Sequence, residues 1–217
     1  MWIFQDKKHS EQTRKEEVVN AVSHGVGAAA AIVAAPFLIY YAVQRGDALT
    51  VAGVRVFIGS AILLYLSSTL FHGLRDGKAK DLFQVFDHVA IFTLIAGTYT
   101  PFTIGILQGS FGLFMLALIW FVAIVGITLR LWLGKSNMKI YVAFYLLMGW
   151  MIFIGIKPLI ENMEFAGLLW LAVGGAAYTL GVIFYLLPRR IYTHFVWHLF
   201  VLAGTTTHFM AVMFYSF

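Results

Sequence analysis

The chain has 217 residues, of which 61% are hydrophobic and only 12% are charged, and its formal net charge is +5. Soluble domains are nearer half apolar and a quarter charged, so this composition excludes an ordinary soluble domain and indicates a lipid environment. The basic residues are scattered between apolar runs without a basic face, which argues against nucleic-acid binding. The absence of cysteine excludes disulfides and thiolate metal ligands.

Seven apolar stretches follow one another, each close to the length of about 20 residues that a membrane-spanning helix needs. The stretches are too long and too continuous for the strands of a membrane barrel. We therefore expect an all-α integral membrane protein in which residues 21–217 form one seven-helix bundle after a polar segment at residues 1–20. That segment lacks the apolar centre of a cleavable signal peptide, so we expect the first stretch to remain as an anchor. The expected spans are 21–43, 50–72, 83–107, 111–132, 138–157, 165–187 and 192–215.

The distribution of lysine and arginine predicts how the bundle is oriented. Most of these residues lie before the first span or after the second, fourth and sixth spans, whereas only Arg45, Arg55 and Lys157 lie on the other side. The majority side holds Lys7, Lys8, Arg14, Lys15, Arg75, Lys78, Lys80, Arg130, Lys135, Lys139, Arg189 and Arg190. Because cytoplasmic segments are enriched in positive charge, we expect a cytoplasmic N-terminus and an external C-terminus.

Five polar residues lie at the ends of three spans that this orientation places at the cytoplasmic face. They are Ser68, His72, Asp87, His194 and His198. Ionisable groups inside a bilayer are costly and indicate a functional site. The two pairs spaced by four residues each share one helix face. Histidines bonded to lipid headgroups or backbone carbonyls are the alternative, but the common depth of all five residues favours a metal site.

Three imidazoles with an open fourth position are typical of catalytic zinc. We expect one zinc ion per chain at His72, His194 and His198, although imidazole also suits other divalent metals. Asp87 would act as a general base or hold a water molecule. Ser68 would orient a ligand histidine or stabilise a developing oxyanion.

Other polar residues near the same face are assigned less specific roles. Glu17, Asn20 and His24 lie on one stripe of the helix that enters the first span, where they would line the mouth of the site or form an interfacial packing cluster. His88 should point to a different face from its neighbour Asp87. His208 lies about 21 Å from His194 along the helix axis, too far to bind the same ion.

The motifs S-T-L-F-H at 68–72, H-F-V-W-H at 194–198 and E-V-V-N-A-V-S-H at 17–24, together with Asp87, resemble those of the progestin and adipoQ receptor family. The small size and short termini resemble its bacterial branch, the hemolysin III proteins. The resemblance covers nearly the whole chain and implies a seven-helix bundle with a cytoplasmic N-terminus. It also implies zinc bound by the three histidines, with Asp87 and Ser68 nearby. A location in the inner membrane of a bacterium is expected.

Three functions remain open. The wider superfamily includes alkaline ceramidases, so the resemblance implies zinc-dependent hydrolysis of a membrane lipid amide or ester. A non-enzymatic protein of lipid or fluidity homeostasis, with structural zinc, is the second possibility, and a pore-forming cytolytic protein is the third. Membrane lipids are the expected partners, as solvent and as substrate. No nucleic acid is expected, and no protein hormone, because a sizeable extracellular domain is lacking.

Overall fold

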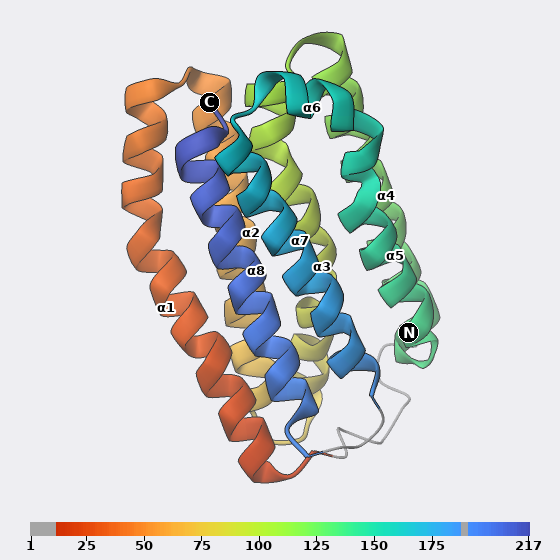
Figure 1. Ribbon diagram of the computed structural model, residues 1–217. Coiled ribbons are helices and arrows are strands. Elements are labelled where there is room, and N and C mark those ends of the chain that lie inside the picture. The colour runs from red at the N-terminus through yellow and green to blue at the C-terminus, as the bar shows by residue number, and fades with distance from the viewer. Residues whose placement is uncertain (1–11, 188–190) are drawn as a thin grey trace.

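The computed structural model describes residues 12–187 and 191–217, which form a bundle of long helices (Figure 1). The helices are α1 (Arg14–Arg45), α2 (Ala48–Gly73), α3 (Lys78–Phe102), α4 (Gly109–Leu133), α5 (Met138–Trp150), α6 (Ile156–Asn162), α7 (Phe165–Leu186) and α8 (Thr193–Tyr215). Shorter helical segments are η1 (Thr103–Leu107), η2 (Gly134–Asn137) and η3 (Met151–Gly155). Lys7, Lys8, Arg189 and Arg190, which contribute to the expected orientation, lie outside the described residues.

Within the described chain, seven helices are long and apolar enough to cross a membrane, which confirms the predicted seven-helix fold. The third span combines α3 with η1, and the fifth combines α5, η3 and α6. The ends differ from the expected ones mainly in α1, which begins at Arg14 rather than at residue 21. A capping box starts the helix there, because Thr13 accepts from the Glu16 amide while the Glu16 carboxylate accepts from the Thr13 amide.

The helices form a closed ring of neighbours. Helix α1 packs against α2 and α8, α2 packs against α3, α3 against α4 and α5, and α5 and α8 both pack against α7. Helix α3 also contacts α8, and it is the most buried of the seven spans. The first and last helices of the chain are therefore direct neighbours (Figure 1).

Glycines allow the close approach of α7 and α8. Gly167, Gly174 and Gly181 recur every seven residues on the face of α7 that meets α8. A methyl group added to any of them would collide with a side chain of α8, whereas Gly175 faces open space. This use of small residues is the usual way in which helices pack closely in lipid, where hydrophobicity alone does not drive association.

One end of the bundle holds the start of α1, the end of α2, the start of α3 and the start of α8 (lower end of Figure 1). We call it the basic end, because the described lysines and arginines expected on the cytoplasmic side lie in the helix ends and connections found there. The opposite end holds Arg45 and Lys157. The basic end is where the polar residues singled out in the sequence lie.

Candidate metal centre

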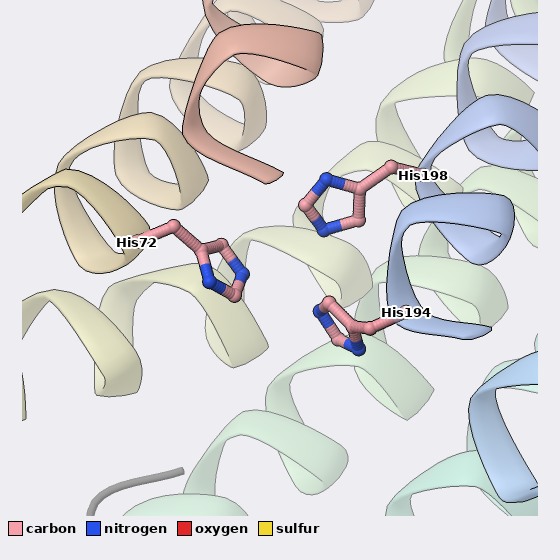
Figure 2. Close-up of side chains that lie close together, drawn as sticks. All are labelled: His72, His194 and His198. Carbon is pink, nitrogen blue, oxygen red and sulfur yellow. The ribbon is translucent and has the colours of Figure 1, made fainter. Parts of the chain in front are cut away.

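Three histidines meet at the basic end of the bundle. His72 comes from the last turn of α2, and His194 and His198 come from the first turns of α8. One ligand nitrogen from each lies within 4.8 Å of the other two. Figure 2 shows the three rings pointing toward a common space. His72 and His198 are only 1% exposed and His194 is partly buried, so the group is accessible from one side.

The start of α8 is held by α1. Tyr192, which precedes α8, has a left-handed backbone with φ of 63°, and its amide donates to Glu16 Oε1 at 2.9 Å. Because the spacing of four residues puts His194 and His198 on one helix face, this fixed start directs both rings toward the end of α2.

Helix α1 also contacts two of the three histidines directly. His72 Nδ1 lies 2.7 Å from Glu17 Oε2, and Glu17 Oε1 accepts from Lys80 Nζ at 2.9 Å. Ser23 Oγ lies 3.0 Å from His198 Nδ1. The ring of His24 stacks on His198, with 3.6 Å between centroids and 7° between planes.

For Glu17, Asn20 and His24 the sequence left open a place at the mouth of the site or in an interfacial packing cluster. Glu17, Asn20 and His24 are all buried, and Asn20 donates to Gln12 Oε1 at 2.9 Å. Glu17 lies behind His72, and His24 lies on the wall of a small cavity beside His198. The wide opening at the basic end is lined by residues such as Glu16, and Glu17 lines a second open cavity together with Lys80.

Asp87 and Ser68 are buried close to the histidines. Asp87 lines the small cavity, of about 30 Å³, together with His194 and His198. The Ser68 hydroxyl is fully buried beside the Asp87 carboxylate. His88, which the sequence reasoning leaves out of the site, also borders this cavity, although its Nδ1 is engaged by Arg130 Nε at 2.9 Å.

The histidines lie between a wide opening and an apolar interior. A cavity of about 810 Å³ opens at the basic end and includes His72 and His194 in its wall. A second cavity, of about 100 Å³, lies inside the bundle and is lined mainly by apolar side chains. The small cavity shares Phe71, His88, Tyr185 and His194 with the wide one, and Leu64, Ile91, Trp197 and Val201 with the apolar one. It therefore adjoins both cavities.

His208 is separate from the three histidines. Its Nε2 lies 3.2 Å from the Leu171 carbonyl oxygen, and the residue lines the apolar cavity. The expectation that His208 does not join the metal ligands agrees with this position, since it is not among the grouped histidines.

Sequence reasoning missed the supporting contacts of Lys80, Ser23 and Arg130. Lys80 had been considered only as a topology signal, yet its side chain is 3% exposed. Ser23 directly precedes His24, and neighbouring residues at the edge of a helix face can both reach the same partner helix. Ser23 also lies three residues after Asn20, so the helical spacing that groups Asn20 with Glu17 allows it as well.

The fold and the site define a class: a multi-pass integral membrane protein with a three-histidine group that can hold a metal ion near one end of the bundle. Within that class, the chain belongs to the haemolysin-III-related family, whose model matches residues 12–209.

Related proteins support this membership over most of the chain. It is 41% identical to a hemolysin-3 homolog of Bacillus subtilis (strain 168), over 94% of this chain and 95% of that one. It is 43% identical to hemolysin-3 of Bacillus cereus, over 93% and 92%. More distantly, it is 31% identical to the human monocyte to macrophage differentiation factor, over 69% and 64%.

Proposed function

We propose that the protein is a zinc-dependent hydrolase that cleaves an amide or ester bond of a membrane lipid. The observation that carries the proposal is the meeting of His72, His194 and His198, whose ligand atoms lie within 4.8 Å of one another. Three imidazoles with an open fourth position form the ligand set of catalytic zinc sites. One zinc ion per chain is assigned to these residues, and other divalent metals that accept imidazole would use the same ligands.

The chemistry of the donor set fits a metal ion. His72 Nε2 is buried and has no hydrogen-bond partner in the described part of the chain, although Nδ1 of the same ring contacts Glu17. A buried polar atom without a partner costs about 1–3 kcal/mol, and ligation of an ion removes that cost. When bound, such an ion supplies a Lewis acid that polarises a carbonyl group and acidifies water.

Asp87 and Ser68 are assigned to the hydrolytic steps. The Asp87 carboxylate, on the wall of the small cavity, takes a proton from water as the water oxygen forms a bond to the carbonyl carbon. The Ser68 hydroxyl, which is buried beside the Asp87 carboxylate, donates to the carbonyl oxygen as that oxygen gains negative charge. Asp87 then returns the proton to the leaving nitrogen or oxygen as its bond to carbon breaks.

The two larger cavities support a lipid as the substrate. The apolar cavity adjoins the small cavity through Leu64, Ile91, Trp197 and Val201, so an acyl chain lying there brings its carbonyl group to the histidines. The wide cavity on the other side is lined by polar residues as well as apolar ones and receives the headgroup. The substrate thus spans the boundary that the histidines occupy.

The basic end of the bundle is assigned to the cytoplasm, with the C-terminus outside, because positive charge is retained on the cytoplasmic side. Two of the relatives are proteins of Bacillus species, which supports a bacterial cytoplasmic membrane as the location. The proposed partners are membrane lipids, without nucleic acid or a protein hormone.

A non-enzymatic role in membrane homeostasis is the second candidate. An ion bound to His72, His194 and His198 would join α2 to α8 and stabilise the bundle without performing chemistry. A pore is less favoured, although two relatives are named as hemolysins. The polar site residues gather at one end, and the apolar cavity farther inside offers no favourable path for ions.

Metal content and lipid turnover, measured on the same detergent-purified proteins, test these assignments. Elemental analysis should find one zinc per chain in the wild type and none in His194→Ala/His198→Ala. The matched control is His208→Ala, which removes another partly buried histidine of α8 and should keep the metal. Turnover is followed with fluorescent amide-linked and ester-linked lipids in mixed micelles, where Asp87→Ala should lose about 10²–10⁴-fold while retaining zinc.

The outcomes separate the three candidates. Zinc with turnover that depends on Asp87 supports the hydrolase. Zinc without turnover, together with a lower unfolding temperature of His198→Ala, favours the structural metal. Wild-type protein without metal, purified in the absence of chelators, rules out both. Release of dye from liposomes at a few copies per vesicle would favour the pore.

A further inference from the structure

Helix α1 contributes no member of the three-histidine group, yet it contacts the outer side of two of them. Glu17 meets Nδ1 of His72 at 2.7 Å, and Ser23 meets Nδ1 of His198 at 3.0 Å. Both contacts are buried. In each ring the contacted nitrogen is the one nearer the backbone, so Nε2 is left for the space that the three rings share (Figure 2).

The contact with Glu17 determines which nitrogen of His72 carries hydrogen. An ionised carboxylate can only accept hydrogen bonds. Glu17 Oε1 already accepts from the Lys80 ammonium at 2.9 Å, so this side chain acts as a carboxylate acceptor beside His72. Oε2 therefore accepts from a protonated Nδ1 of His72, and the lone pair of the ring is on Nε2. This agrees with Nε2 of His72 being the buried nitrogen without a partner among the described residues.

The contact with Ser23 does the same for His198. The Ser23 hydroxyl donates its hydrogen to the Asn20 carbonyl oxygen at 2.8 Å. Its oxygen is consequently the acceptor for His198 Nδ1, and the lone pair of this ring is also on Nε2. The parallel ring of His24, 3.6 Å away, restricts rotation of the His198 imidazole about its bond to Cβ.

We propose that α1 is the positioning helix of the metal centre: Glu17 and Ser23 hold His72 and His198 in the tautomer and orientation that present Nε2 to the ion. The inference rests on the metal site proposed above. Hydrogen-bond partners of the non-ligating nitrogen of ligand histidines fix the tautomer of the ring. Removing such a partner typically lowers metal affinity about 10–100-fold. Glu17, Ser23 and His24 are positioning residues and touch no reacting atom. The stripe of polar residues at 17–24 is thereby explained.

Zinc affinity, measured by competition with a chromophoric chelator, and the visible spectrum of the Co²⁺-loaded protein test the proposal. Ser23→Ala should weaken zinc binding about 10–100-fold and alter the Co²⁺ spectrum. Ser23→Thr, which keeps a hydroxyl, should restore both. Glu17→Ala should act like Ser23→Ala, and combining it with Lys80→Met removes the ammonium that would otherwise be left without its carboxylate. The control on the same helix is Val22→Ala, because Val22 is 59% exposed toward the surroundings of the bundle.

The unfolding temperature in excess chelator separates orientation from folding. Ser23→Ala should unfold in chelator at nearly the wild-type temperature and differ only in its metal properties. Wild-type affinity and an unchanged Co²⁺ spectrum in Ser23→Ala and in the Glu17 variant would overturn the positioning role while leaving the metal site intact. A wild-type protein that binds neither Zn²⁺ nor Co²⁺ overturns the site and the inference together. If the variants bind zinc more weakly but the wild type does not turn over lipid, the positioning role is supported and only the proposed hydrolase activity is ruled out.

Discussion

The buried ion pair between Lys80 and Glu17 should contribute strongly to stability, and Lys80→Met tests it. The ammonium lies 2.9 Å from Glu17 Oε1, and the two side chains are 3% and 5% exposed. At an effective dielectric constant of about 20, their attraction is about 6 kcal/mol. Desolvation offsets part of this, and loss of one partner of a buried pair typically costs about 3–5 kcal/mol. For a chain of this length, that lowers the unfolding temperature by about 6–20 °C.

Thermal unfolding in detergent, followed by tryptophan fluorescence, is the assay for Lys80→Met, Glu17→Gln and the double variant. Because the double variant removes both members of the buried pair, its loss should be smaller than the combined losses of the two single variants by about 0.5–3 kcal/mol. Lys157→Met is the matched control, since Lys157 lies 4.0 Å from Glu161 and both side chains are more than half exposed. It should change stability by less than about 1 kcal/mol. The reasoning would be refuted if Lys80→Met unfolded at the wild-type temperature. It would also be refuted if the losses of stability in the two single variants added up to the loss in the double variant.

Three further changes test the bundle away from the metal centre. Tyr99→Phe removes a hydroxyl that bonds three backbone groups where the fifth span is interrupted, and should destabilise by about 1–3 kcal/mol; unchanged melting would contradict this bonding. The hydrogen bond from the Thr50 backbone amide lowers the pKa of Asp47 below its ordinary 3.8. Asp47→Ala should therefore be less stable than wild type at neutral pH, and this difference should vanish as acid protonates Asp47 in the wild type. A loss that persists at pH 2 would exclude this cap. Gly181→Ala should destabilise by about 1–3 kcal/mol because α8 lies against it, whereas Gly175→Ala, on the same helix but facing open space, should not; equal melting would show that this contact is not tight.

The number and type of the spans could be predicted because the apolar runs are as long as a bilayer requires. The ends were less predictable, since hydropathy does not show where hydrogen bonding begins. Helix α1 starts at Arg14 among charged residues because Thr13 and Glu16 cap each other. That pair has the spacing of a capping box, a signal present in the sequence but outside a reading based on apolar length.

The common depth of the polar residues along the spans could be predicted from the order of the spans and from the four-residue spacings. The structure brings His72, His194 and His198 together. The rotation of each helix about its own axis did not follow, because it depends on packing between helices distant in sequence. This is why the sequence left Glu17 between the mouth of the site and a packing cluster, and why it did not show that Glu17 contacts His72 or that His88 borders the small cavity beside Asp87.

The neighbouring positions of α1 and α8 have a consequence for biosynthesis. Ser23 and His198 are 175 residues apart, and Glu16 and Tyr192 are 176 apart, yet each pair is in contact. A growing chain therefore inserts α1 before α8, so the helix that contacts His72 and His198 is made before the helix that carries His194 and His198. Until α8 leaves the ribosome and docks, His72 faces α1 without the other two imidazoles. If the proposed ion binds to all three histidines, its acquisition would mark a chain that has been translated through α8, and chains terminated before α8 would lack it.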